Sequence, residues 1–308
     1  MTWLSANKKV EKEIMKTDIF CEILYEAGYP EEKALSSLEI AFSLFRDFEQ
    51  RYSRFLKGNE LWNFNESEGG VISEELFRIL QESKRYHEAT GGLFDPSILP
   101  ALEAEGYAGV YNKTTSTKES IPFLELSLDH TTLTAKKPFG LKIDLGGIGK
   151  GLIADKVSAF LGKNYRHHIV DAGGDIFAKG SNQKESYPYW AIDIEHPFMP
   201  ETSAALLLLS DMAVATSGKN RRHWIKNGSK KHHIIDPITE KSASSDLLSV
   251  TVIAENVTKA DVFAKTLFIA GKERGILLAE TLSLPAIFID QDAAITINRF
   301  AESYVWKS

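Results

Sequence analysis

Four glycines fall within residues 144–151, between a short apolar segment and an amphipathic stretch. Glycine has no Cβ, so such a turn lets the backbone approach a ligand closely and direct amide N–H groups at an anion. The spacing is not the G-x-G-x-x-G dinucleotide fingerprint, and it is not a phosphate loop, because Asp144 replaces the first glycine and Gly151 the Ser/Thr. Lys150 opposes the dipole of the helix it begins, which a bound diphosphate would explain. The segment indicates a phosphate-binding turn, with a purely structural turn as the alternative.

The apolar residues follow both helical and strand periodicities. Spacings of three and four predict helices over residues 31–48, 73–90, 150–161 and 258–270. Alternating or short apolar runs predict strands over residues 19–25, 142–144, 168–171, 190–194, 206–209, 212–215, 233–235 and 249–254. Hairpin arms are expected at 126–128 with 131–134, and at 286–289 with 294–297. Because hairpins replace a regular βαβ alternation, we expect an α+β fold with mixed, largely antiparallel sheets and packed helices.

Composition excludes several classes of protein. The 308 residues include 36 Lys+Arg and 42 Asp+Glu, and the net charge of −6 gives no electrostatic footprint for nucleic acid. No run approaches the ~20 apolar residues of a membrane span, and the first residues lack an apolar signal segment, so we expect a cytoplasmic protein. The one cysteine, Cys21, excludes an internal disulfide and is expected in the core. The length allows one large domain or two intimate ones.

Further polar residues are candidates for chemistry. Residues 171–175 form a second glycine turn flanked by carboxylates. His232 and His233 are adjacent, and on a strand only one of them can enter a given pocket. Asp261 and Lys265 lie one helical turn apart, the spacing of an ordinary ion pair. The eight histidines include no H-E-x-x-H, so a zinc hydrolase site has no support.

Taken in order, eight blocks of this chain resemble the ApbE family, the FAD:protein FMN transferases. The blocks are Met15-Lys16-Thr17, Ser53-Arg54-Phe55, residues 90–96, 144–151, 171–176, 215–218 and 233–237, and Ala260-Asp261. The resemblance covers residues 15 to about 297. It implies that residues 15–308 form a single domain with the fold of that family, and that residues 1–14 are an N-terminal extension.

The resemblance implies a Mg²⁺-dependent transferase. Such an enzyme splits the diphosphate of FAD, releases AMP and joins FMN by a phosphoester to a Thr or Ser of a target flavoprotein. The family's acceptor motif, D-G-x-[ST]-G-A-T, is absent from this chain, so the target is expected to be a separate protein. The alternatives are an FAD-binding protein with weak or no transferase activity, an FAD pyrophosphatase, and an oxidoreductase that uses FAD for redox chemistry. The missing dinucleotide fingerprint counts against the last.

Carried over by position, the resemblance also implies roles for single residues. The expected FAD contacts are Met15, Phe55, Leu93, Phe94, Asp95, Asp144, Lys150 and Ile234. Of these, Leu93, Phe94 and Asp95 would line the adenosine pocket, and Lys150 would hold the diphosphate and act in catalysis.

The resemblance implies two further kinds of site residue. His233 matches the catalytic histidine near the acceptor hydroxyl. The Gly147 carbonyl and the Asp261 carboxylate match metal ligands, whereas Lys265 stands where the family usually has a Thr ligand. An ammonium group there removes one oxygen ligand and adds repulsion, so we expect weak activation by Mg²⁺.

Overall fold

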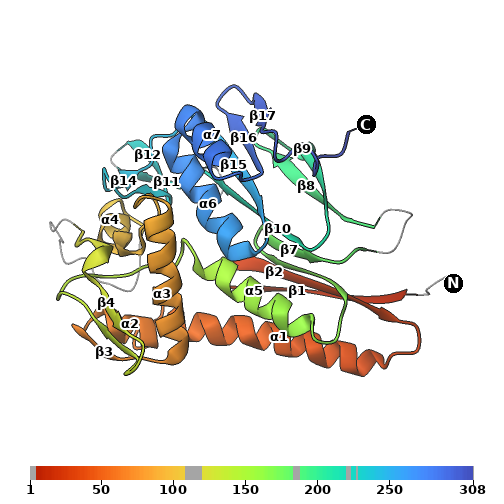
Figure 1. Cartoon of the computed structure of the whole chain (residues 1–308), viewed down its shortest axis with the longest axis horizontal. Helices are drawn as coiled ribbons and strands as arrows, with labels where there is room; N and C mark the ends of the chain where they lie inside the picture. Colours follow the sequence, from red (N-terminus) through yellow and green to blue (C-terminus); the bar gives the residue numbers. More distant parts are fainter. Residues whose placement is uncertain (1–4, 108–119, 183–187, 220–222, 227, 308) are drawn as a thin grey trace. The chain divides into compact units, whose positions relative to one another are not determined.

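The computed structural model describes residues 5–107, 120–182, 188–219, 223–226 and 228–307 (Figure 1). The chain divides into two compact units. Unit 1 consists of residues 1–49, 149–217 and 246–308, and unit 2 of residues 50–148 and 218–245. Within the described ranges, no helix has the length and apolar character needed to cross a membrane.

Unit 1 is built on an eight-stranded sheet with the order β1-β2-β6-β7-β10-β15-β16-β17. The strands are β1 Ser5–Ile14, β2 Thr17–Glu26, β6 His167–Ala172, β7 Asp175–Lys179, β10 Met212–Gly218, β15 Leu247–Ala254, β16 Ala286–Asp290 and β17 Ile295–Ile297. The pairs β1–β2, β2–β6, β6–β7, β7–β10, β15–β16 and β16–β17 are antiparallel. The expected α+β class with largely antiparallel sheets is therefore confirmed.

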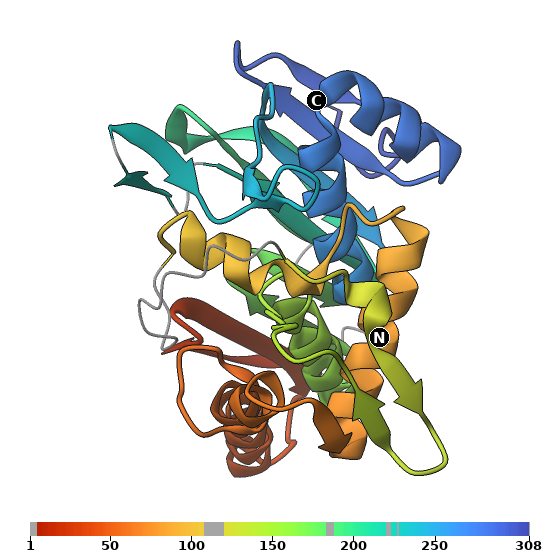
Figure 2. The ribbon, with the colours of Figure 1, turned by 90° about the vertical axis from the view of Figure 1, so that its left-hand side faces the viewer.

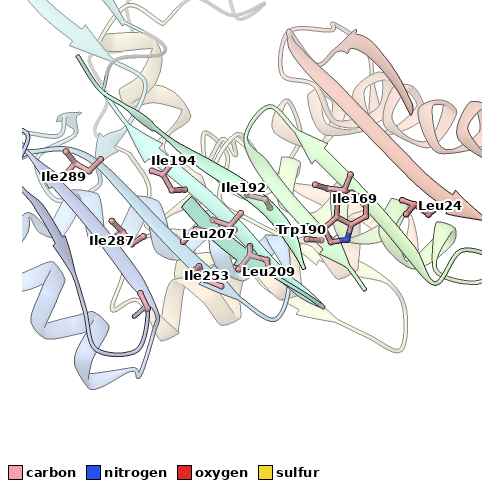
Figure 3. Close-up of a cluster of buried hydrophobic side chains, with 13 residues drawn as sticks. Leu24, Ile169, Trp190, Ile192, Ile194, Leu207, Leu209, Ile253, Ile287 and Ile289 are labelled. Carbon is pink, nitrogen blue, oxygen red and sulfur yellow. The ribbon is translucent and has the colours of Figure 1, made fainter. Parts of the chain in front are cut away.

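A long hairpin covers one face of this sheet. Its strands are β8 Trp190–His196 and β9 Met199–Leu209, which pair antiparallel. Figure 3 shows that buried side chains of the hairpin, among them Trp190 and Leu207, form one apolar cluster with side chains of the sheet such as Ile169 and Ile287. Burying this much apolar surface is the main stabilising contribution of the layer.

Helices contact the sheet strands of unit 1 from the other face. They are α1 Glu31–Tyr52, whose last residues belong to unit 2, α5 Gly149–Leu161, α6 Val257–Ala270 and α7 Lys272–Thr281. On β6, Ile169 joins the hairpin cluster, whereas the adjacent His168 forms a hydrogen bond with Ser158 of α5. Neighbouring residues of a strand point to opposite faces, so this pair places hairpin and helix on opposite sides of the sheet. Helices α5 (green) and α6 (blue) lie side by side in both views (Figures 1 and 2).

The described part of unit 2 contains the helices α2 Glu60–Asn65, α3 Glu74–Ala89 and α4 Leu99–Ala104, and the single 3₁₀ turns Pro96–Ile98 and Phe123–Glu125. Its three-stranded sheet has the order β3-β5-β4, with β3 Gly69–Val71, β4 Ser127–Asp129 and β5 Thr134–Lys136. Two small hairpins follow, β11 His223–Lys226 with β12 Ser229–His232, and β13 Ile235–Asp236 with β14 Lys241–Ser242. Helix α3 begins where the sequence predicts, because the Ser73 hydroxyl accepts a hydrogen bond from the Leu76 N–H.

Two predicted strands are wrong in detail. Residues 142–144 form no strand, because the Asn65 side chain takes the place of a neighbouring strand: its amide donates to the Ile143 carbonyl, and its oxygen accepts from the Ile143 N–H. The predicted strand at 233–235 is interrupted, since β12 ends at His232 and β13 begins at Ile235. The hairpin predicted at 126–134 exists, but its second arm is β5, three residues later than expected at its start.

Candidate functional site

The glycine turn of residues 144–151 leads directly into α5. A Cβ at Gly151 would lie 2.6 Å from the Thr258 Cα, so only glycine allows the first turn of α5 to approach the start of α6 this closely. The Asp155 carboxylate fixes the same contact by accepting hydrogen bonds from the Val257 and Thr258 N–H groups, at 2.7 and 2.9 Å. The close approach of the two helix starts brings Lys150 of α5 near Asp261 of α6.

Four charged side chains form a cluster in unit 1, which we call the lysine cluster. Lys150 forms an ion pair with Asp175, the last residue of the second glycine turn, and Lys265 forms one with Asp261. The i,i+4 pair expected from the sequence is thus confirmed. Both carboxylates are buried, whereas the two lysines are partly exposed.

Within the lysine cluster, Asp261 has a raised pKa. Burial and the nearby Asp175 carboxylate raise the pKa of Asp261 to about 6, and the charges of Lys265 and Lys150 oppose that rise. Its Oδ1 atom contacts Lys265, and no residue within the described ranges donates a hydrogen bond to its buried Oδ2 atom. A buried, unpaired carboxylate oxygen is costly, so this atom is a point at which a bound ligand would gain affinity.

The side chains around Asp261 offer few oxygen ligands for Mg²⁺. A divalent cation there would sit beside the Lys265 ammonium group, and the hydroxyl of Thr266, the residue after Lys265, donates to the Val262 carbonyl instead. Among the residues that the structure describes, no group of three or more His, Cys, Asp or Glu side chains could hold a metal ion. In this arrangement the residues at Asp261 do not fit Mg²⁺, whose near-octahedral shell requires oxygen ligands.

Met15 of unit 1 occupies the turn between β1 and β2. Its φ is +58°, in the left-handed region that few non-glycine residues adopt, and its N–H donates to the Glu49 carboxylate at 3.0 Å. The backbone at this expected FAD contact is therefore held in an uncommon conformation by α1.

Unit 2 contains a second polar group, centred on Arg54. The Arg54 Nε donates to the Asp144 carboxylate at 2.9 Å, and both side chains are buried. The other Asp144 oxygen accepts from the Gly146 N–H at 2.7 Å. Asp144, expected as an FAD contact, therefore uses both of its oxygens to tie the glycine turn to Arg54, a residue to which the sequence analysis gave no role.

Aromatic rings surround Arg54 and extend toward His233. The Arg54 guanidinium carbon lies 4.4 Å from the centre of the Phe55 ring and 4.6 Å from that of Tyr107. Tyr107 stacks on Trp224, with ring centres 5.2 Å apart, and its centre lies 6.5 Å from that of His233. Phe55 and His233, far apart in the chain, thus belong to one group of rings, which we call the aromatic cluster. Tyr107 and Trp224 were missed because no motif marks them.

The two adjacent histidines have different surroundings. His232 is buried, its Nε2 lies 3.0 Å from the Ala243 carbonyl, and burial lowers its pKa. His233 is half-buried in the bend after β12 and faces Tyr107, while Ile234 is buried. The structure therefore places His233 beside the aromatic cluster.

The segment expected to line an adenosine pocket is held by its own hydrogen bonds. The Phe94 N–H donates to the Thr90 hydroxyl, and the Phe94 carbonyl lies 3.0 Å from the His87 Nδ1. Asp95 caps a 3₁₀ turn by accepting a hydrogen bond from the Ser97 N–H, whereas Leu93 is half-buried.

The two residues expected as metal ligands belong to different units. Gly147 lies in unit 2, and Asp261 lies in unit 1.

Comparison with known proteins identifies the family to which this chain is similar. Residues 15–288 match the model of the ApbE family. The chain is 29% identical over 288 residues to an FAD:protein FMN transferase from Vibrio cholerae, covering 89% of this chain and 85% of that protein. It is 28% identical over 301 residues to an FAD:protein FMN transferase from Treponema pallidum, covering 89% and 83%.

Solved structures show the same fold. The flavin transferase ApbE from Vibrio cholerae superposes with a TM-score of 0.82 at 23% identity, covering 97% of this chain and 99% of that one. An ApbE protein from Thermotoga maritima gives a TM-score of 0.85 at 23% identity, covering 98% and 100%. The fold expected from the resemblance is confirmed.

Proposed function

The chain belongs to the ApbE family, and we propose on that premise that it transfers FMN from FAD to a Thr or Ser hydroxyl of a separate protein. The observation that carries the proposal is the family match over residues 15–288, together with relatives that are named FAD:protein FMN transferases. These names do not favour the alternative of a binding protein without activity.

The proposed reaction is a phosphoryl transfer. The acceptor oxygen bonds to the phosphorus of the FMN moiety, the bond from that phosphorus to the bridging oxygen breaks, and AMP leaves with the bridging oxygen. The hydroxyl proton passes to a base. Such reactions are limited by the placement of the nucleophile and by neutralisation of charge on the phosphate oxygens.

The lysine cluster is suited to charge neutralisation. Lys150 lies in the first turn of α5 and Lys265 in α6, and each ammonium group is partly exposed beside a buried carboxylate. A diphosphate that binds there exchanges carboxylate contacts for phosphate contacts, and the N-terminal amides of α5 favour the same anion. We propose that Lys150 holds the diphosphate.

The aromatic cluster supplies rings and a base. Half-buried Phe55 and Tyr107 offer ring surfaces to a planar ligand. His233 is half-buried at the edge of the cluster, and an imidazole can accept the proton of an acceptor hydroxyl near neutral pH. We therefore propose His233 as the base.

Intact-mass measurement tests the proposal. The protein is incubated with FAD, with or without Mg²⁺, and with an acceptor protein that carries the motif D-G-x-[ST]-G-A-T. We expect the acceptor to gain the mass of FMN less one water while an equal amount of AMP appears. AMP and free FMN with an unmodified acceptor would indicate a pyrophosphatase, and an unmodified acceptor without AMP would refute the proposal.

A further inference from the structure

Arg54 has one buried nitrogen, Nη1, that the described residues leave without a hydrogen-bond acceptor. Its Nε donates to Asp144, and its Nη2 donates to the Tyr107 carbonyl at 3.3 Å. Its Nη1 is buried and has no hydrogen-bond partner among the described residues, although only 4% of Arg54 is exposed. Buried donors of charged groups are rarely left without an acceptor, so this atom needs an explanation.

The rings beside Arg54 do not provide that acceptor. Phe55 and Tyr107 lie at 85° to each other, with the guanidinium carbon over both. A ring face attracts a cation but offers no lone pair in the plane of the N–H groups. Both rings are half-buried, so a planar ligand that takes the place of one ring reaches the edge of the guanidinium from the open side.

Glu103 has an unpaired hydrogen-bond acceptor, in contrast to the unpaired donor of Arg54. Its buried Oε1 finds no hydrogen-bond donor in the part of the chain that the structure describes. The charges of Arg54 and Asp144 both act on Glu103, as do those of Lys142 and Glu66, which form a partly exposed ion pair. Glu103 therefore lies close enough to Arg54 and Asp144 for their charges to act on it, and burial raises its pKa.

From these two unpaired atoms we infer that Arg54 and Glu103 bind the edge of a planar heterocycle that carries a hydrogen-bond acceptor next to an N–H donor. The Arg54 Nη1 donates to the acceptor, and the Glu103 Oε1 accepts from the N–H. The inference rests on the proposed function, because FAD contains two such edges. One is the imide edge of the isoalloxazine, and the other is the amino edge of adenine.

The charges favour a neutral edge over a phosphate group. Asp144 already neutralises Arg54, and Glu103 adds a further carboxyl group. A phosphate at this point would meet two carboxyl groups for one guanidinium, whereas a neutral edge satisfies both unpaired atoms without adding charge.

Binding titrations of the full-length chain test the inference. The variants are Arg54→Lys, which retains a cation for Asp144 but lacks Nη1, and Glu103→Met, which removes the acceptor at similar volume. The controls are Arg78→Lys and Glu74→Met, which alter an exposed i,i+4 pair on α3. Affinities for FAD, FMN and ADP are measured by calorimetry, and folding is checked by circular dichroism.

We expect each test variant to bind FAD about 10- to 100-fold more weakly, the effect of one hydrogen bond to a charged group, and the controls to bind as wild type. A loss shared by FMN but not ADP assigns the isoalloxazine, and a loss shared by ADP but not FMN assigns adenine. If the ring is the isoalloxazine, methylation of its N3 weakens wild-type binding but not that of Glu103→Met.

The outcomes separate this inference from the proposed function. Wild-type protein that binds and transfers FMN, with both variants binding all three ligands within twofold of wild type, overturns the inference alone. Wild-type protein that does not bind FAD overturns both. If Arg54→Lys fails to fold, the titration of Glu103→Met decides.

Discussion

The lysine cluster of unit 1 and the Arg54 group of unit 2 both hold charged side chains in a buried environment, but they use different kinds of residue to do so. Each buries carboxylates beside cations, and each leaves a buried polar atom unsatisfied. In unit 1 the unsatisfied atom is an acceptor, Asp261 Oδ2, and the cations are flexible ammonium groups. In unit 2 the cation is a planar guanidinium fixed by hydrogen bonds to Asp144 and to the Tyr107 carbonyl, and its unsatisfied atom is a donor.

The ammonium groups of unit 1 can change position, whereas the guanidinium of unit 2 is held in one orientation. A lysine is a point charge on a flexible stem and can exchange one anion for another, whereas an arginine fork is pre-organised for a particular set of acceptors. The lysine cluster is therefore suited to a diphosphate whose charge changes during the reaction. The Arg54 group is suited to holding a ring in one orientation.

The largest expected effect concerns the base that we assign to unit 2. His233→Ala should lower FMN transfer about 10²- to 10⁴-fold, the usual contribution of a general base, while FAD binding is retained. Transfer is measured by AMP release, and binding by calorimetry. The control is His130→Ala, an exposed histidine of the same unit. Unchanged turnover in His233→Ala would remove this residue from the mechanism.

The next effect concerns stability and contrasts a buried with an exposed ion pair. Arg54→Met leaves the Asp144 carboxylate buried and unpaired, which should cost about 3–5 kcal/mol of unfolding free energy. The matched change Arg78→Met, in an exposed pair with Glu74, should cost less than about 1 kcal/mol. Urea unfolding measures both. Equal losses would show that Arg54 is not the centre of its group.

The sequence predicts the regular elements of this chain better than its polar contacts. Helix α3 follows from the Ser73 cap and its apolar spacing, whereas β1 was missed because it is an edge strand of alternating lysines and glutamates with no apolar run. Residues 142–144 mislead because a side-chain amide, not a strand, satisfies their backbone.

For the site residues, too, local contacts could be predicted from the sequence, whereas contacts between distant residues could not. The Asp261–Lys265 pair follows from helical spacing, which is local information. The role of Arg54 depends on Asp144 and Tyr107, which lie 90 and 53 residues away and are brought together only by folding. The one available signal was an arginine beside an aromatic residue in the block Ser53-Arg54-Phe55.

A pH effect of intermediate size on the free energy of unfolding is expected from His168 of unit 1. Burial lowers the pKa of His168 to about 4, from an ordinary value of 6.5. Between these values the unfolded chain binds a proton that the folded chain does not, so this histidine makes stability fall as the pH falls. Between pH 7 and pH 5 the loss should be about 2 kcal/mol.

Urea unfolding of wild type and His168→Gln at both pH values measures this contribution. The variant is less stable at pH 7, because it loses the contacts of the ring with Ser158 and Tyr165. Its stability should nevertheless fall less between pH 7 and pH 5 than that of wild type. Parallel pH profiles would show that His168 is protonated in the folded chain.

The smallest expected effect tests whether the lysine cluster replaces a metal. Lys265 contacts the Asp261 carboxylate that a divalent cation would need, so wild-type FAD binding should be insensitive to EDTA and activity only weakly raised by Mg²⁺. Lys265→Thr removes the ammonium group and supplies an oxygen, and should gain Mg²⁺-dependent AMP release by up to about tenfold, the factor that corresponds to 1.4 kcal/mol.

Lys265→Met is the matched control for this change, because it removes the charge without adding an oxygen ligand. Only the threonine variant should show a Mg²⁺-dependent rise in melting temperature, a measurement that does not require activity. If Lys265 instead turns to solvent and water completes a metal shell, wild-type enzyme will be silenced by EDTA and restored by submillimolar Mg²⁺. That result would contradict the proposal that the lysines of unit 1 take the place of a metal, since unit 1 would then use a metal ion rather than its own ammonium group to neutralise the diphosphate.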